Sequence, residues 1–377
     1  MSDAAPVHLA GLGVARPATS MSQMELADAA ITCCCDNAQQ AKVLRELYRR
    51  SGVERRGCAI LDGHVDGKSR QIEEVFPPRR THSDRGPTLE ARMQLYVEAA
   101  GPLAIRAAAE ALRDASIHAS TVGHLITVSC TGFAAPGVDS LLIQQLGLSP
   151  NVSRTHVGFM GCHAAINGWQ IADALAARTG RPSLLVCVEV CTAHFAYGWE
   201  PNRLVANALF ADGAAAAVLQ PESQTTPENR PGPHMIDRLS RIVPQSGDAM
   251  TWQLGDHGFE MTLSPRVPEH IERHAGDALL SFLRSHDLTP HQLVGVIVHP
   301  GGPRVVRATT AALGLPASAA QSSLDALREH GNLSSPTVLT ILSKMLRESP
   351  QHQSETKHWL VVAFGPGLAI EAMLLRG

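Results

Sequence analysis

The strongest constraint on the fold is that the two halves of this 377-residue sequence repeat one order of elements. In the first half a predicted strand ends at Cys130, and Gly161-Cys162 precedes a predicted helix. In the second half a predicted strand ends at His299, and Gly331-Asn332 precedes a predicted helix. Cys162 follows Cys130 by 32 residues, and Asn332 follows His299 by 33. The repeat predicts a duplicated α/β unit in which Cys162 and Asn332 face each other across a pseudo-twofold axis.

Strands and helices alternate along most of the chain, which is typical of an α/β fold with buried sheets. Short apolar runs predict strands at 125–130, 155–160, 184–190, 214–219, 294–298, 359–363 and 368–375. Helical spacing of apolar residues predicts helices at 89–113, 136–146, 164–178, 269–285, 305–313, 323–330 and 336–348. The polar, proline-rich stretch 221–233 is typical of a linker. We therefore expect an N-terminal half at 1–222 and a C-terminal half at 235–377.

The composition excludes several classes of protein. Hydrophobic residues make up 44% of the chain and charged residues 18%, which suits a large core. The 32 Lys and Arg against 35 Asp and Glu give a formal net charge of −3, so no basic field attracts nucleic acid. No apolar run reaches the roughly 18 residues of a membrane helix. The N-terminus also lacks the pattern of a secretion signal. We expect a soluble cytoplasmic enzyme without a nucleic-acid partner or a membrane span.

The chain has eight cysteines: Cys33, Cys34, Cys35, Cys58, Cys130, Cys162, Cys187 and Cys191. In a long chain without a secretion signal, we expect reduced thiols rather than a disulfide framework. No C-x-x-C pair occurs, and no Cys/His set has zinc spacing, so we expect no metal site. At most one of these thiols is expected to be catalytic.

Three positions are candidate catalytic residues. Cys162 follows a predicted strand and a glycine and begins a predicted helix, where the helix dipole favours a thiolate. A buried small cysteine is the alternative. His299 ends a predicted strand, where open α/β sheets place ligands. Asn332 suits either a helix cap or a donor to an oxyanion. A Cys/His/Asn set suits acyl-thioester chemistry, in which the thiolate takes the acyl group and two donors stabilise an enolate.

With these residues, the chain resembles the type III polyketide synthases, the chalcone/stilbene synthase-like group of the thiolase superfamily, and in particular their bacterial members. The matching segments are Gly158–Cys162, Ala208–Gly213, His299–Pro303, Gly331–Ser335 and Phe364–Leu368. The resemblance implies a thiolase-like α/β fold, with two αβαβα halves related by a pseudo-twofold axis, and an obligate homodimer. It also implies that Cys162, His299 and Asn332 are the catalytic set.

The mechanism implied by the resemblance uses CoA thioesters as substrates and no other cofactor. An acyl-CoA starter acylates Cys162, and His299 holds the thiolate as an ion pair. Malonyl-CoA then loses carbon dioxide, and His299 and Asn332 stabilise the enolate that attacks the acyl-cysteine. Repeated extension and cyclisation give a pyrone, a resorcinol or a related product.

Further positions match the family's substrate-binding residues. Phe210 matches a gatekeeper, and Met261 stands where the family has a second gatekeeper phenylalanine, with Phe259 two residues away. Trp252 stands where plant members have a small cavity residue, so we expect a narrowed pocket. Arg50 matches a basic residue at the CoA mouth, with Arg45, Arg49 and Arg304 as candidate helpers. The remaining cavity-lining matches are Cys130, Thr131, Cys191, His194 and Ser334.

Two other segments stand out. The Ala135-Pro136 loop matches one that reaches into the partner's cavity, where a cis proline is expected. The stretch 64–85 is longer than in plant members and carries no motif that we recognise.

Two alternatives remain open from the sequence. A β-ketoacyl-ACP synthase III-like enzyme shares Cys/His/Asn, although its histidine usually precedes Gln-Ala-Asn rather than Pro-Gly-Gly. A non-catalytic thiolase-fold scaffold is the second. For the starter, similarity to bacterial members suggests a fatty acyl-CoA, while an aromatic or short-chain starter remains open.

Overall fold

A nine-stranded sheet forms the frame of the molecule, with the strand order β13-β14-β15-β10-β1-β9-β8-β6-β7. The computed structural model describes residues 6–65, 68–224, 232–348 and 356–377. In chain order the strands of this sheet are β1 (Val7–Ala15), β6 (His124–Ser129), β7 (Ser153–Gly158), β8 (Ser183–Val190), β9 (Asp212–Pro221), β10 (His234–Ile242), β13 (Gly295–Val298), β14 (His358–Gly365) and β15 (Ala369–Arg376). Three two-stranded sheets add β2 (Ser20–Ser22) with β3 (Arg55–Gly57), β4 (His64–Val65) with β5 (Lys68–Ser69), and β11 (Met250–Gly255) with β12 (Gly258–Leu263).

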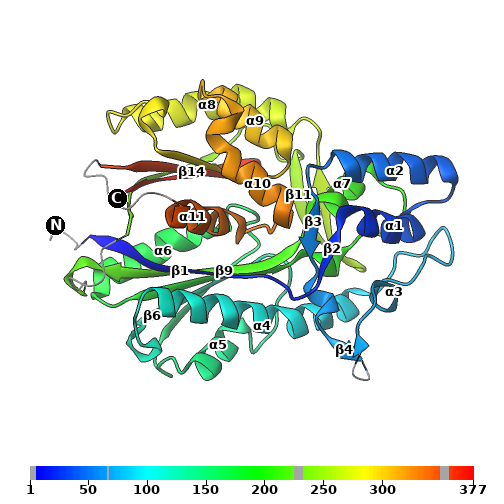
Figure 1. Cartoon of the computed structure of the whole chain (residues 1–377), viewed down its shortest axis with the longest axis horizontal. Helices are drawn as coiled ribbons and strands as arrows, with labels where there is room; N and C mark the ends of the chain where they lie inside the picture. The colour runs from blue at the N-terminus through cyan, green and yellow to red at the C-terminus, as the bar shows by residue number, and fades with distance from the viewer. Residues whose placement is uncertain (1–5, 66–67, 225–231, 349–355) are drawn as a thin grey trace.

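The helices lie in three layers around this sheet (Figure 1). They are α1 (Gln23–Cys34), α2 (Ala38–Arg50), α3 (Ile72–Val75), α4 (Leu89–Asp114), α5 (Val138–Leu146), α6 (Ala164–Thr179), α7 (Pro201–Leu209), α8 (Val267–Arg284), α9 (Pro303–Ala312), α10 (Gln321–His330) and α11 (Thr337–Glu348). Helices α6 and α11 contact strands of both halves and lie between them. Helices α4 and α5 cover one outer side, and α8 and α9 cover the other. The expected αβαβα layering is confirmed.

The two halves of the sheet meet between β1 and β10, where a single residue pair, His8 and His234, is in register. Strands β1, β9, β8, β6 and β7 belong to the N-terminal half, and β13, β14, β15 and β10 belong to the C-terminal half. Within each half, a parallel pair, β6–β7 or β13–β14, ends at the side of the molecule that carries the predicted site residues. The duplication therefore brings the ends of corresponding strands toward one another.

Small residues allow the long helix α4 to lie directly on β1. A Cβ atom at Gly13 would lie 2.1 Å from the carbonyl oxygen of Ala107, so that only glycine fits at this position. The facing side of α4 is built from alanines that are fully buried, including Ala104 and Ala108. Because these side chains are short, the helix backbone approaches the strand closely, and the apolar contact is buried on both sides.

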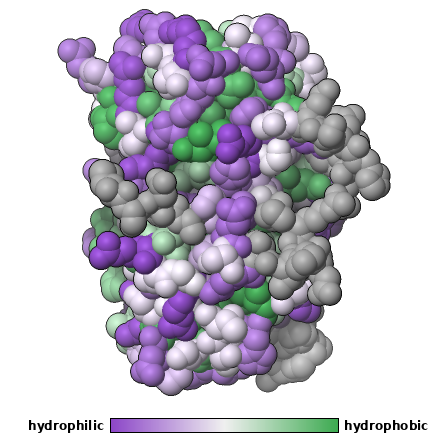
Figure 2. Space-filling model, turned by 90° about the vertical axis from the view of Figure 1, so that its left-hand side faces the viewer, coloured by the Kyte–Doolittle hydropathy of each residue, from purple (hydrophilic) through white to green (hydrophobic). Residues whose placement is uncertain are grey.

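The predicted elements correspond to observed helices and strands, whereas β1, α1, α2, β10 and the β11–β12 hairpin had not been predicted. The predicted linker 221–233 lies partly outside the described residues. No helix in the described parts of the chain is both long and apolar enough to cross a membrane. The face near the two termini is mostly hydrophilic, with hydrophobic residues scattered among polar ones (Figure 2).

Candidate active site

Cys162 lies in the turn between β7 and α6, two residues before the helix begins. Gly161 has a φ of +86°, and a Cβ atom there would lie 2.5 Å from Cδ of Pro366. The turn before Cys162 is therefore packed directly under the loop between β14 and β15. This contact joins the cysteine of the N-terminal half to the C-terminal half.

Asn332 lies between α10 and α11 and is paired with Phe210 in an isolated parallel bridge. Its backbone N–H donates to Leu209 at 2.8 Å, and its carbonyl oxygen accepts from the N–H of Ala211 at 2.9 Å. The side-chain oxygen Oδ1 accepts from the N–H of Ser334 at 2.8 Å. The expectation that Asn332 opens a helix is wrong, because α11 begins at Thr337. With Oδ1 engaged by the backbone, the NH₂ group is the end of the side chain that is left to donate to Cys162.

The sulfur of Cys162 contacts residues of the opposite half. Burial raises the pKa of the Cys162 thiol to about 12, and hydrogen bonds with Ser334 and Asn332 act in the opposite direction. The buried carboxylate of Glu189 raises this pKa further. The helix dipole favours a thiolate at this position, whereas burial favours the protonated thiol and is the larger of the causes acting on its pKa.

His299 directly follows β13, and its backbone N–H donates to Val362 at 2.8 Å. The imidazole is 1% exposed, and neither ring nitrogen has a hydrogen-bond partner among the described residues. Burial lowers the pKa of His299 to about 3, and the neighbouring His163 lowers it as well. His163 directly follows Cys162, so His299 lies near the start of α6. Burial thus shifts the pKa values of Cys162 and His299 in the directions that favour the neutral forms of both groups.

Glu189 is a buried carboxylate beside Cys162 that the sequence reasoning did not single out as a site residue. It lies in β8 and accepts hydrogen bonds from the backbone N–H of Cys130 at 2.9 Å and from Oγ1 of Thr131 at 2.7 Å. Its second oxygen accepts from Oγ of Ser335 at 2.6 Å. Burial raises its pKa to about 7 against the opposing effect of these bonds. The signal in the sequence was a lone carboxylate within a continuous apolar strand.

Five of the predicted cavity residues line one small pocket of about 60 Å³, which we call the inner pocket. They are Cys191, His194, Phe210, Trp252 and Met261, and Phe259 lies among them. Cys130, Thr131 and Ser334 are buried but do not line this pocket. Cys130 and Thr131 nevertheless hold two of its lining residues. The carbonyl oxygen of Cys130 accepts from the indole N–H of Trp252 at 2.7 Å, and the carbonyl oxygen of Thr131 accepts from Nε2 of His194 at 2.6 Å.

Arg50 lines a second pocket of about 490 Å³, which we call the entrance pocket. This pocket also contacts Leu209, Gly301, Arg304 and Arg307, so it reaches the chain segments that hold Phe210 and His299. The predicted helpers Arg45 and Arg49 do not line it and form ion pairs with Asp28 and Glu46 respectively; Arg50 also pairs with Glu46 but does line the pocket. Of the three candidate helpers, only Arg304 therefore joins Arg50 at this pocket.

The bond between Ala135 and Pro136 is cis, as expected from the sequence. This loop lines a third pocket of about 650 Å³ together with Phe133, whose side chain is 62% exposed. In the described parts of the chain, no group of three or more His, Cys, Asp and Glu side chains is arranged to hold a metal ion.

Comparison with known families and relatives identifies the chain. Family models described as "Chalcone and stilbene synthases, N-terminal domain" and "C-terminal domain" match residues 2–222 and 235–377. The α-pyrone synthesis polyketide synthase-like protein Pks18 of Mycobacterium tuberculosis is 30% identical, over 97% of this chain and 89% of its own length. The 3,5-dihydroxyphenylacetyl-CoA synthase of Streptomyces toyocaensis is also 30% identical, over 98% of this chain and 90% of its length.

Solved structures agree with these relatives. The crystal structure of PKS-I from the brown alga Ectocarpus siliculosus superimposes with a TM-score of 0.87 and 28% identity, covering 100% of this chain and 99% of the other. The type III polyketide synthase domain of Steely1 from Dictyostelium gives a TM-score of 0.86 and 25% identity, with 99% of each chain covered. These matches support the polyketide synthase and not the β-ketoacyl-ACP synthase III-like alternative. The chain therefore belongs to the chalcone and stilbene synthase family and is a type III polyketide synthase, a malonyl-CoA-dependent condensing enzyme.

Proposed function

We propose that Cys162 is the acyl-carrying nucleophile of this synthase and that His299 and Asn332 act on its substrates. The observation that carries this proposal is the contact of the Cys162 sulfur with Asn332 and Ser334 from the opposite half. An acyl group on this sulfur would lie within reach of an amide NH₂ that has no other assigned role. Such a donor is what a developing oxyanion requires.

In the loading step, the neutral imidazole of His299 takes the proton of the Cys162 thiol. The thiolate attacks the carbonyl carbon of the acyl-CoA, the bond from that carbon to the CoA sulfur breaks, and the CoA thiolate takes the proton from His299. The ring nitrogens of His299 have no hydrogen-bond partner among the described residues, so one of them is available to take this proton once substrate contacts stabilise the charged pair. The transfer converts two buried neutral groups into a charged pair only while substrate is bound.

In the condensation step, the bond between the methylene carbon of malonyl-CoA and its carboxylate breaks, which releases carbon dioxide and leaves an enolate. Asn332 Nδ2 and the N–H of His299 donate to the enolate oxygen. The enolate carbon then attacks the acyl carbonyl on Cys162, and the carbon–sulfur bond breaks to return the thiolate. The backbone contact at Oδ1 fixes Asn332 for this role before substrate arrives.

The entrance pocket is our candidate for the CoA site. Arg50, Arg304 and Arg307 supply guanidinium groups for phosphates, and the latter two lie in the first half of α9. We propose that CoA thioesters are the substrates, that no other cofactor takes part, and that the product is a pyrone, a resorcinol or a related ring. The two halves at 1–222 and 235–377 each supply part of this machinery.

We further propose that the enzyme is a homodimer of the cytoplasm. Phe133, Phe159 and Met160 are large apolar residues that are 62%, 54% and 40% exposed, and Phe133 lines a pocket with the Ala135-Pro136 loop, which suits contact with a second copy. All eight cysteines are free, which suits a reducing compartment. Light scattering of the purified protein measures the mass of the assembly, and a monomer at micromolar concentration would exclude the dimer.

Acylation tests the nucleophile directly. The purified enzyme is incubated with acetyl-CoA, and the intact mass is measured for wild type, Cys162→Ala and Cys35→Ala. Cys35 is a partly exposed thiol that lines none of the three pockets described above. We expect an acetyl adduct on wild type and Cys35→Ala and none on Cys162→Ala. An adduct that survives in Cys162→Ala would refute the assignment.

A further inference from the structure

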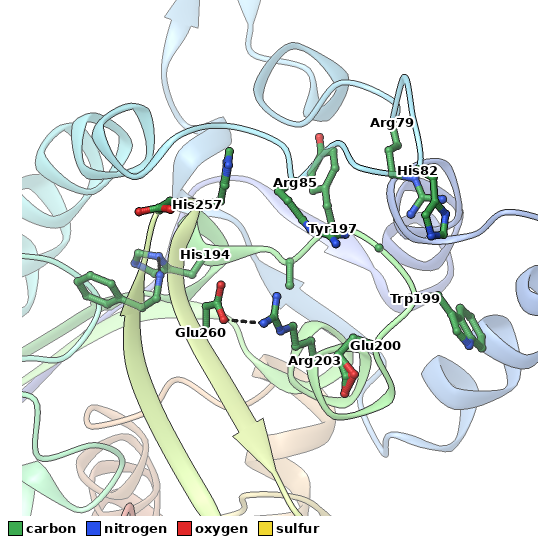
Figure 3. A pocket seen from close by; sticks show the side chains of 14 residues that line it. Arg79, His82, Arg85, His194, Tyr197, Trp199, Glu200, Arg203, His257 and Glu260 are labelled. Atoms are coloured by element: carbon green, nitrogen blue, oxygen red, sulfur yellow. Dashed lines mark hydrogen bonds and ion pairs between the residues drawn. The ribbon is translucent and has the colours of Figure 1, made fainter.

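The inner pocket shares a wall with a larger pocket of about 410 Å³, which we call the outer pocket. His194, Ala196, Arg203 and Phe259 line both pockets, so the wall between them is one layer of residues. Figure 3 shows the outer pocket, with His194 at one side, Arg79 and His82 at the opposite side, and the Arg203–Glu260 ion pair along its lower edge.

The inner pocket is too small for a polyketide. Its volume of about 60 Å³ corresponds to about two water molecules at their liquid volume of ~30 Å³ each. Sites that enclose small-molecule ligands usually measure about 300–1,000 Å³. A chain extended by more than one malonyl unit therefore needs space beyond the inner pocket. The outer pocket offers that space, and the shared wall separates the two pockets.

One side of the wall is fixed. His194 Nδ1 accepts from the backbone N–H of Phe259 at 3.0 Å, so Nε2 carries the ring proton and donates to the carbonyl oxygen of Thr131. Burial lowers the pKa of His194 to about 4, and the ring stays neutral. Both ring nitrogens are thus engaged, and the imidazole cannot turn without losing two hydrogen bonds.

The other side of the wall is held only by ring contacts. The Phe259 ring stacks on His194 with centroids 4.4 Å apart and planes 6° apart, and the edge of Trp252 meets both rings. A contact between two rings is worth about 0.5–1.5 kcal/mol beyond the area that it buries. The Phe159 ring also meets Phe259, with centroids 5.9 Å apart. Rotation of the Phe259 side chain would therefore cost ring contacts but no side-chain hydrogen bond.

The outer pocket is rich in N–H donors. The side chain of Arg79 is 7% exposed; its Nη2 pairs with Asp36, and its Nη1 is buried without a partner among the described residues. Gly198 lies beside both guanidinium groups. A Cβ atom at Gly198 would lie 2.9 Å from Nη1 of Arg85 and 3.5 Å from Nη1 of Arg79, so the absence of a side chain gives both arginines room. Two guanidinium groups thus converge on one point of the pocket wall.

The acidic residues of the outer pocket have other roles or lie at its mouth. Glu260 pairs with Arg203 at 2.5 Å, and Oε1 of Glu200 accepts from the N–H of Asn202 at the start of α7. Asp256 is exposed. Nη1 of Arg79 and the guanidinium group of Arg85 are therefore donors of this pocket for which the described parts of the chain show no protein acceptor.

We propose that the outer pocket is the far part of the product site and takes the growing poly-β-ketone chain when the Phe259 ring turns aside. This inference rests on the proposed function. A poly-β-ketone carries an acceptor oxygen on every second carbon, which suits the donors of Arg79 and Arg85. A fatty acyl tail would desolvate these guanidinium groups without pairing them, at a high cost. The pocket thus favours a short starter and several extensions over the fatty acyl starter suggested by similarity to bacterial members.

The test compares product lengths by mass spectrometry after reaction of acetyl-CoA with malonyl-CoA. The variants are Arg85→Gln, which removes an exposed donor of the outer pocket, and Phe259→Leu, which thins the wall. Arg80→Gln is the matched control, because Arg80 is an exposed arginine of the same segment that lines neither pocket. We expect wild type and Arg80→Gln to extend at least twice. In Arg85→Gln the share of the longest product should fall at least fivefold, and in Phe259→Leu it should rise.

The outcomes separate the two proposals. If wild type makes no condensation product from any of acetyl-CoA, malonyl-CoA alone or decanoyl-CoA, the proposed function fails, and this inference fails with it. If wild type condenses but both variants keep its product distribution within twofold, only the inference fails. A single extension in wild type, or preferred use of decanoyl-CoA, would also overturn it. Because Arg85 is exposed, its variant keeps the test valid even if Phe259→Leu does not fold.

Discussion

The carboxylate of Glu189 accepts a hydrogen bond from Oγ of Ser335 at 2.6 Å, which ties β8 of the N-terminal half to the loop before α11 in the C-terminal half. Its other oxygen holds the backbone N–H of Cys130 and the hydroxyl of Thr131. The same carboxylate lies close enough to Cys162 to raise the pKa of that thiol. Glu189 therefore connects the two halves directly beside the nucleophile.

Replacing Glu189 by Gln should destabilise the protein. An amide NH₂ would face groups that all donate, so that at least one buried donor is left without a partner, at a cost of about 1–3 kcal/mol. Chemical denaturation measures the free energy of unfolding. Glu272→Gln is the control, since Glu272 is exposed on α8 and its loss should change stability by less than about 0.5 kcal/mol. Equal stability of the two variants would show that the Glu189 network is not a structural link.

The stability difference between wild type and Glu189→Gln should depend on pH. Burial raises the folded-state pKa of Glu189 from 4.5 to about 7, so the folded protein holds this proton more tightly than the unfolded chain. The corresponding stabilisation is complete below about pH 4.5 and is lost as the pH rises through 7. The advantage of wild type should therefore shrink by up to about 1.4 kcal/mol per pH unit in this window. A difference that grows with pH would contradict the sign of the shift.

Alkylation of Cys162 should show whether the resting thiol is paired with His299. Since burial raises its pKa to about 12, the rate of alkylation by iodoacetamide should rise about tenfold per pH unit from pH 6 to 9, without a plateau. Peptide mass mapping measures modification at Cys162 separately from the partly exposed Cys35. A plateau below pH 8 would instead indicate the thiolate–imidazolium pair that the sequence suggested.

Sequence patterns predicted the elements that are buried on both faces. Strand β8 is an apolar run apart from Ser183 at its start and Glu189 near its end, and this pattern can be recognised from the sequence alone. Strand β10 was missed because Asp237, Arg238 and Arg241 alternate irregularly along a half-exposed edge of the structure. The β11–β12 hairpin, which carries Trp252 and Phe259, was missed because its two strands are only six residues each and mix apolar with polar residues.

The protonation states of Cys162 and Glu189 could not be predicted from sequence because they depend on how deeply each side chain is buried. Cys162 does precede a helix, as predicted, but the motif contains no information on how far the sulfur lies from solvent. The role of Glu189 could be identified only from the structure, in which donors from two distant segments, Cys130-Thr131 and Ser335, converge on its carboxylate. In both cases the deciding quantity is burial produced by the opposite half of the chain.

Asn332→Asp should remove the donor to the enolate and keep the local structure. The aspartate retains an oxygen for the N–H of Ser334, so the loop before α11 has no reason to move. A carboxylate in place of the NH₂ group repels the enolate, and we expect malonyl-CoA decarboxylation to slow by about 10²–10³. Release of labelled carbon dioxide measures this step, and acyl loading of Cys162 from acetyl-CoA is the internal control. Unchanged decarboxylation would exclude Asn332 from the step.

Gly161→Ala should be far more damaging than Gly180→Ala. Both glycines have positive φ values, +86° and +67°, so alanine is strained at each by a similar amount. Nothing lies within 4 Å of a Cβ atom at Gly180, whereas one at Gly161 would lie 2.5 Å from Cδ of Pro366. Thermal unfolding should show a modest loss of stability for Gly180→Ala and a loss larger by about 1–3 kcal/mol for Gly161→Ala.

The contact between Gly161 and Pro366 should also cause the two variants to differ in the rate of acyl transfer to Cys162. Relief of the clash must move either the β14–β15 loop or the turn that holds Cys162, and a shift of about 1 Å at the nucleophile is enough to slow acylation by about 10²-fold. We therefore expect slow acetyl transfer to Cys162 in folded Gly161→Ala and a rate near that of wild type in Gly180→Ala. Equal acylation rates in the two folded variants would mean that the cysteine turn tolerates displacement of the loop, and that the contact between the halves serves stability alone.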